Sequence, residues 1–156
     1  MDKKDQLIDK IIELEAAKKE LQSRKYLEDL YLFNTEVLKV EEQVPLGTFH
    51  KELCDLIIDK ENNKKLLLVP RGHLKSTLVT VGYSLLRICK NPSVRILIAN
   101  ATYNMATAFL SQIKKHLQGN ETLKDYYGDL ATEADKWSEN MISVKSQKHS
   151  KGRKQQ

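Results

Sequence analysis

The chain has little cysteine, proline, glycine or tryptophan, and it has no long hydrophobic run. Its 156 residues include 2 cysteines, 3 prolines, 6 glycines and 1 tryptophan. The two isolated cysteines, Cys54 and Cys89, suit buried thiols in a reducing compartment better than a disulfide framework or a zinc site. No apolar run reaches the ~20 residues that a transmembrane helix needs. The polar first residues lead into no apolar signal segment, so we expect neither membrane insertion nor secretion.

The composition is that of a single soluble globular domain, with 40% hydrophobic and 30% charged residues. The net charge of +5 belongs to one end of the chain. Residues 145–156 contain five basic residues and no acid, so the rest of the chain is neutral overall. We therefore expect a disordered basic tail that attracts polyanions without specificity, rather than a basic groove on the folded surface.

One segment has the residue types of a phosphate-binding loop. Val69–Thr77 reads VPRGHLKST; it follows the apolar run Leu66–Val69 and precedes a stretch with helical periodicity. In a P-loop, backbone N–H groups and a helix N-terminus point at phosphate oxygens, where the helix dipole favours negative charge. A lysine reaches the β- and γ-phosphates and a hydroxyl ligates Mg²⁺, and Lys75 and Ser76 stand at those positions.

The segment departs from the general pattern G-x-x-x-x-G-K-[ST] at both glycine positions. Val69 and Leu74 stand where the glycines would fall, and Gly72 remains as the glycine of the loop. A bulky residue at positive φ is a conformational outlier, so we expect Leu74 at negative φ and Gly72 to make the turn. An ordinary strand-to-helix turn with a capping serine is the alternative interpretation of these residues.

The spacing of apolar residues predicts helices that alternate with strands. Leu7, Ile11, Leu14 and Leu21 predict an N-terminal helix with a narrow apolar stripe, either a solvated peripheral helix or one that pairs with another chain. Further helices are predicted over residues 26–38, 48–62, 76–90 and 105–119, the second of them capped at position 48, and strands over 66–69, 94–99 and 141–144.

The expected fold class is α/β, a P-loop NTPase-type parallel sheet flanked by helices, incomplete and with an N-terminal helical extension. The nearly continuous apolar run Val94–Ala99 is typical of a strand buried on both faces of a parallel sheet. We divide the chain into a helical extension (1–44), a partial P-loop ATPase domain (45–145) and the basic tail (146–156).

The order of these features resembles one family. Phe49-His50, the loop at 69–77, the strand and turn from Arg95 to Tyr103, and Lys136-Trp137-Ser138 follow one another as in the N-terminal ATPase domain of tailed-bacteriophage terminase large subunits. These proteins are the motors that package viral DNA. The resemblance covers roughly residues 45–144, and an arginine-bearing, glycine-poor P-loop is characteristic of the family.

The resemblance implies ATP and Mg²⁺ as cofactors. Lys75 would hold the β- and γ-phosphates, Ser76 would ligate Mg²⁺, and residues 72–74 would offer backbone donors. Arg71 would lie beside the γ-phosphate and stabilise charge during catalysis together with Lys75. Phe49 and His50 fall where the family holds the adenine, although His50 fits a helix-start residue equally well. The implied nucleotide-binding set is Phe49, His50, Arg71, Gly72, His73, Leu74, Lys75, Ser76 and Thr77.

The resemblance also implies binding partners and a location in the cell. The partners are double-stranded viral DNA, the portal and the small terminase subunit, and the full-length protein would form a homo-oligomeric ring. The implied location is the cytoplasm of a bacterial host cell.

The sequence has no acidic residues at the end of a strand after the loop, where an ATPase of this kind needs them. A later strand ending in Asp or Glu normally coordinates Mg²⁺ and orients the attacking water. No such strand is predicted after residue 100, and Asp125, Asp129 and Asp135 stand in polar surroundings. We therefore expect a chain truncated before the acidic strand and the nuclease domain, and inactive as an isolated ATPase. The alternatives are another P-loop ATPase of the helicase-like kind, and a non-enzymatic prophage remnant.

Overall fold

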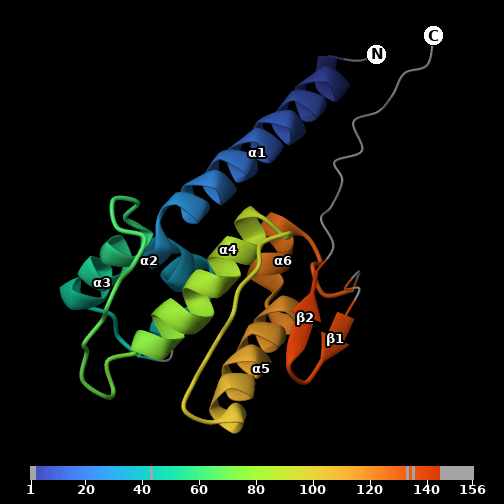
Figure 1. The fold of residues 1–156 in the computed structure, drawn as a ribbon. Helices are drawn as coiled ribbons and strands as arrows, with labels where there is room; N and C mark the ends of the chain where they lie inside the picture. Colours follow the sequence, from blue (N-terminus) through green and yellow to red (C-terminus); the bar gives the residue numbers. More distant parts are fainter. Residues whose placement is uncertain (1–2, 43, 133, 135, 145–156) are drawn as a thin grey trace.

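The computed structural model describes residues 3–42, 44–132, 134 and 136–144, and these residues are mostly helical (Figure 1). The helices in chain order are α1 (Lys3–Glu28), α2 (Leu30–Leu32), the π-helix η1 (Phe33–Val37), the 3₁₀-helix η2 (Val40–Glu42), α3 (Thr48–Ile58), the π-helix η3 (Ser76–Tyr83), α4 (Ser84–Lys90), α5 (Tyr103–Gly119) and α6 (Glu121–Tyr127). Strands β1 (Lys136–Ser138) and β2 (Met141–Ser143) form an antiparallel hairpin with Trp137 opposite Ile142. The tail at 146–156 lies outside the described residues.

The parallel sheet is absent from the described part of the chain, so the prediction of an α/β, P-loop NTPase-type sheet flanked by helices is wrong. Residues 66–69 and 94–99 run extended, but neither segment pairs with the other or with any described strand. Figure 1 shows them on opposite sides of the continuous helix made by η3 and α4. A ladder needs backbones about 4.8 Å apart, which two separated segments cannot provide.

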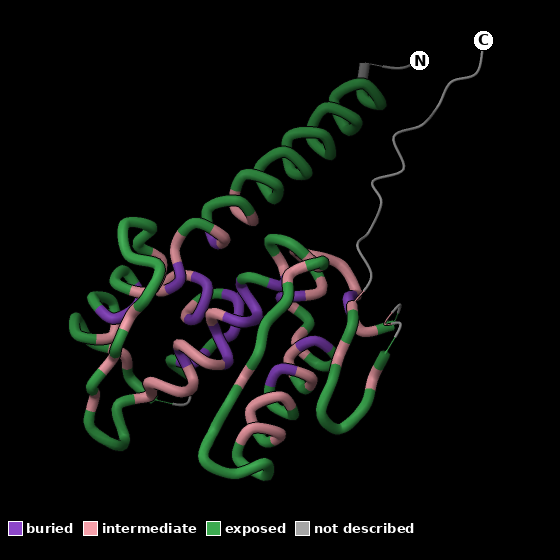
Figure 2. The backbone as a smooth tube through the Cα atoms, in the orientation of Figure 1, coloured by how far each residue is buried: buried purple, intermediate pink, exposed green. Residues whose placement is uncertain are grey.

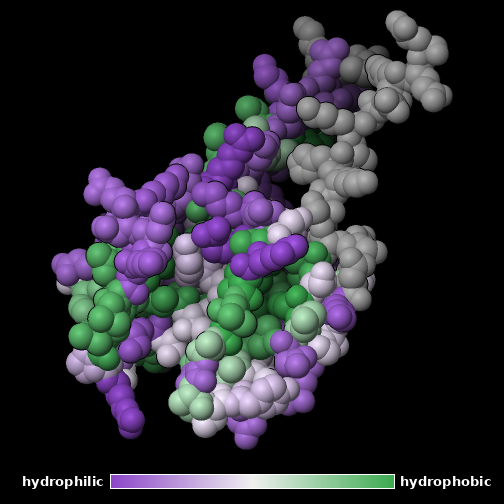
Figure 3. Space-filling view, viewed as in Figure 1, coloured by the Kyte–Doolittle hydropathy of each residue, from purple (hydrophilic) through white to green (hydrophobic). Residues whose placement is uncertain are grey.

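Both extended segments leave large apolar side chains in solvent. Leu66 and Leu68 are 83% and 84% exposed, and Leu97 is 92% exposed. The alternate residues Leu67 and Val69 are half-buried, as the two-residue period of an extended chain requires. Figure 3 shows hydrophobic surface gathered over α3 with the segment beside it, and again over the segment that leads to α5. The expectation that 94–99 is buried on both faces is therefore wrong.

The core lies among the helices, and the N-terminal part of the chain contributes to it (Figure 2). Tyr127 Oη donates a hydrogen bond to the Ser23 carbonyl (2.9 Å), and Asn120 Nδ2 donates to the Val37 carbonyl (2.9 Å), which ties α6 to the N-terminal helices. The fully buried apolar side chains among the described residues are Leu30, Phe33, Val37, Cys54, Leu78, Val81, Leu85, Ile113, Leu117 and Leu123.

The predicted helices are present with adjusted ends. The helix predicted over 26–38 is divided at Asp29, whose side chain accepts a hydrogen bond from the Leu32 N–H (3.0 Å) and so starts a new helix. The helix α3 is preceded by Gly47 as its N-cap, and Thr48 is its first residue instead of the cap. The helix α5 begins after Thr102, which caps the Met105 N–H, and ends at Gly119 as expected.

The two π-helices cross where Asn34 of η1 meets Gly82 of η3. Asn34 is fully buried; its Nδ2 donates to the Leu30 carbonyl (2.8 Å), while its Oδ1 has no hydrogen-bond partner among the described residues. A Cβ placed on Gly82 would lie 2.1 Å from Asn34 Oδ1. Close approach of the two helices therefore requires glycine at position 82.

The two cysteines are free thiols, Cys54 buried and Cys89 partly buried. Burial raises the pKa of each thiol to about 12, so both stay protonated and poorly nucleophilic at neutral pH. The expectation of buried thiols is confirmed for Cys54 and holds in part for Cys89.

Candidate phosphate-binding loop

Residues 71–74 form a tight turn between an extended segment and the start of η3. Gly72 has φ +84°, as expected, but Leu74 has φ +51°, so the prediction of a negative φ at Leu74 is wrong. The Leu74 carbonyl accepts the first helical hydrogen bond, from the Leu78 N–H at 2.9 Å, and its half-buried side chain packs against the core. Helix start and packing together hold the residue in a conformation that costs roughly 1–2 kcal/mol.

We expect the strain at Leu74 to be visible in a pair of variants. Leu74→Ala and Leu74→Gly both lose the packing contacts that the leucine makes beyond Cβ, but the glycine relieves the left-handed conformation. The Gly variant should therefore exceed the Ala variant in unfolding free energy by about 1 kcal/mol. Urea unfolding of the two proteins measures the difference. Equal stabilities, or a more stable Ala variant, would show that position 74 carries no strain.

Lys75 follows the turn directly and has helical dihedral angles (φ −49°, ψ −49°). It is half-buried, and it forms no ion pair with any residue in the described ranges. Ser76 and Thr77 occupy the first turn of η3, and no side chain caps this helix. The alternative of an ordinary turn with a capping serine therefore lacks its capping hydrogen bond.

The start of α3 lies beside the loop. The Phe49 ring is edge-on to the His73 ring, with centroids 6.0 Å apart, and edge-on to the His50 ring at 5.6 Å. His50 Nδ1 accepts a hydrogen bond from the Gly47 N–H (2.9 Å), so this nitrogen serves the helix start. His73 Nδ1 lies 3.1 Å from the Arg71 carbonyl oxygen. The structure thus brings Phe49-His50 and the loop, which are well separated in the sequence, into contact through the rings of Phe49 and His73.

The loop fits a phosphate group better than it fits a metal ion. Arg71 and Lys75 supply two cationic side chains at the two ends of the turn, and Gly72 and His73 between them are exposed. Within the ranges that the structure describes, no three His, Cys, Asp or Glu side chains gather to hold a metal ion. Mg²⁺ binds through carboxylates and substrate phosphates with several waters, so the Ser76 hydroxyl is not a sufficient site by itself.

Asp125 and Asp129, which stand in polar surroundings in the sequence, have local structural roles. Asp125 pairs with Lys19, and Asp129 Oδ2 lies 3.2 Å from Lys124 Nζ. Hydrogen bonds from the Thr132 backbone and side chain hold the pKa of Asp129 well below its ordinary value. Asp135 lies outside the described residues. Neither described carboxylate is free of a partner, which agrees with surface roles.

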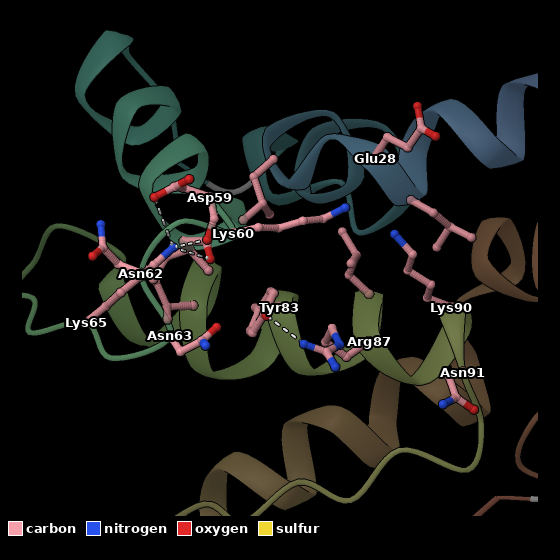
Figure 4. A pocket seen from close by; sticks show the side chains of 15 residues that line it. Glu28, Asp59, Lys60, Asn62, Asn63, Lys65, Tyr83, Arg87, Lys90 and Asn91 are labelled. Atoms are coloured by element: carbon pink, nitrogen blue, oxygen red, sulfur yellow. Dashed lines mark hydrogen bonds and ion pairs between the residues drawn. The ribbon is translucent and has the colours of Figure 1, made fainter.

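A groove of about 870 Å³ opens elsewhere, between α1, the end of α3 and α4 (Figure 4). None of the loop residues line it. The sequence did not predict a site at its basic side chains. Lys65 Nζ donates to carbonyls at the end of α3, including that of Ile57 (3.1 Å). Arg87 Nη1 donates to Tyr83 Oη (2.9 Å). Basic residues at helix C-termini complement the helix dipole, so these cations have a structural explanation.

Comparisons with protein-family models, with curated proteins and with solved structures find no match to this chain. Among the described helices, none is long and apolar enough to cross a membrane.

Proposed function

We propose that residues 71–77 bind the phosphate groups of ATP, and that the chain is the nucleotide-binding part of a viral DNA-packaging motor of the terminase large-subunit kind. The observation that carries the proposal is the left-handed conformation of Leu74 directly before Lys75. Strained non-glycine residues cluster at functional sites, and the general P-loop pattern has at this position a glycine, the residue type that adopts positive φ most readily.

The charges and rings around the loop support the same proposal. Lys75 has no anionic partner among the described residues, so a phosphate oxygen can take that role. Phe49 and His73 offer ring faces and edges beside the loop, where a base can stack. The His50 hydrogen bond to Gly47 favours a helix-start role for that residue, so we place the adenine contact at Phe49.

The DNA, portal and small-subunit partners, the ring assembly and the bacterial cytoplasm rest on the sequence resemblance. The proposal for this chain is binding without turnover, because no acidic strand is predicted after the loop and no three His, Cys, Asp or Glu side chains gather among the described residues to hold a metal ion. A nucleotide bound at the loop would add phosphate oxygens beside Ser76, and Mg²⁺ would then contribute charge neutralisation.

Titration of the full chain with ATP and with AMP tests this proposal. ATP should bind at least about tenfold more tightly than AMP, since the lysine contacts the β- and γ-phosphates. Phosphate release should stay at background in the same samples. Equal affinity for the two nucleotides, or no binding of either, would show that the loop does not bind phosphate. The remaining hypothesis would then be a non-enzymatic prophage remnant. Steady turnover would show that a carboxylate completes the site.

A further inference from the structure

Helix α1 projects from the folded body (Figure 1), and most of its length is classed as exposed (Figure 2). Only its last part joins the core: Tyr26 is buried, Ser23 accepts a hydrogen bond from Tyr127, and Lys19 pairs with Asp125. The exposed fractions along the projecting part are 61% for Leu7, 46% for Ile8, 48% for Ile11, 59% for Ile12, 61% for Leu14 and 68% for Leu21. An isolated helix gains little stability from such side chains, so a partner surface is to be expected.

The exposed residues have the spacing of a coiled coil. Leu7, Ile11, Leu14, Lys18 and Leu21 are separated by four, three, four and three residues, which places leucine at the d positions and Ile11 at an a position. In a parallel coiled coil, isoleucine at a with leucine at d favours two strands. We refer to these five residues as the α1 seam.

The α1 seam is not the face that meets the folded body. At 3.6 residues per turn, Lys19, Ser23 and Tyr26 lie roughly a third of a turn around the helix from the seam. A second helix can therefore reach the seam without displacing the contacts to α6.

The charges beside the α1 seam favour a second copy of the same chain as its partner. Lys10 falls at a g position and Glu15 at the e position of the next heptad, so in a parallel pair each Lys10 faces the Glu15 of the other copy. Neither residue forms an ion pair within the described ranges. An antiparallel pair sets e against e and g against g, and the two charges would not meet.

Lysines limit the strength of this pairing. Lys18 lies at an a position inside the seam, and Lys4 and Lys25 occupy the a positions on either side. In a parallel pair each of these lysines faces the same lysine of the other copy, which lowers the stability of the coiled coil. The pairing should therefore be reversible and dependent on protein concentration.

We infer that α1 mediates a parallel homodimer of this chain through the seam Leu7–Leu21, aligned by Lys10 and Glu15 of opposite copies. This inference is independent of the nucleotide proposal. Sedimentation equilibrium of the full chain should show a monomer–dimer equilibrium at micromolar concentrations.

Charge variants separate this dimer from non-specific association. Lys10→Glu and Glu15→Lys should each weaken the dimer about tenfold, because two attractions per dimer become repulsions. The double variant Lys10→Glu/Glu15→Lys should restore it. Glu13→Lys, at a position facing solvent in the coiled coil, is the matched control and should leave the equilibrium unchanged. Association that is insensitive to these changes would come from the exposed leucines elsewhere and would overturn the inference.

A cysteine placed in the seam tests the orientation. Leu7→Cys should crosslink to the same position of the other copy under mild oxidation, because residue 7 faces residue 7 only in a parallel pair. Crosslinking between Leu7→Cys and Leu21→Cys chains, with none in Leu7→Cys alone, would show an antiparallel pair. A chain that stays monomeric up to about 0.5 mM would also overturn the inference.

Discussion

Replacing Gly82 with alanine should lower the unfolding free energy by about 3 kcal/mol, a large fraction of the ~5–15 kcal/mol that stabilises a native domain. The new Cβ would lie 2.1 Å from Asn34 Oδ1, and Asn34 is fully buried with its Nδ2 bonded to the Leu30 carbonyl. The amide cannot swing away without breaking that bond, so the two π-helices must separate. Urea denaturation followed by circular dichroism measures the loss.

Two further variants locate the cause of that loss. Gly119→Ala is the matched control: nothing lies within 4 Å of a Cβ at this helix-end position, so stability should change by less than about 0.5 kcal/mol. Asn34→Ala in the Gly82→Ala background should recover part of the loss, because it removes both the clash and an unpartnered buried oxygen. A Gly82→Ala protein as stable as the parent would mean that the helices do not cross this closely.

Replacing Lys75 with alanine should weaken ATP binding ten- to a hundredfold. The change removes a charge-assisted contact to the β- and γ-phosphates, worth about 1.5–3 kcal/mol. Folding stability should change little, since Lys75 forms no ion pair with the described residues. Isothermal titration with ATP, alongside urea unfolding of the same protein, separates the two effects.

Lys64→Ala is the matched control for net charge, because Lys64 is exposed in the segment after α3. It should bind ATP like the parent. If both lysine variants lose affinity equally, the attraction is a general effect of charge; if neither does, the loop does not hold the phosphates.

The helices could be predicted from the sequence because their information is local. The spacing of Leu78, Val81 and Leu85 matched one buried face, and Gly119 with Asn120 marked the end of α5. The side chain of Asn120 also caps α6, accepting from the Leu123 N–H at 2.8 Å. Periodicity and capping residues act within a few positions, so one sequence is enough to read them.

The sheet could not be predicted in the same way. The runs 66–69 and 94–99 have the composition of buried strands, and both are extended, but a strand exists only when a second backbone lies beside it. Composition cannot show whether that partner is present. The conformation of Leu74 was missed for a related reason, because the start of η3 and the core packing of its side chain override the local preference for negative φ.

Although α6 was not predicted, local sequence patterns indicated the other main helices, the residue types of the loop Val69–Thr77, and the apolar stripe along α1. Each follows from side-chain chemistry at short spacing. The tertiary structure alone decided that the two apolar runs stay unpaired, that Phe49 meets His73, and that Asn34 presses against Gly82. These features join residues far apart in the chain, and their geometry depends on how the helices pack, which no local pattern encodes.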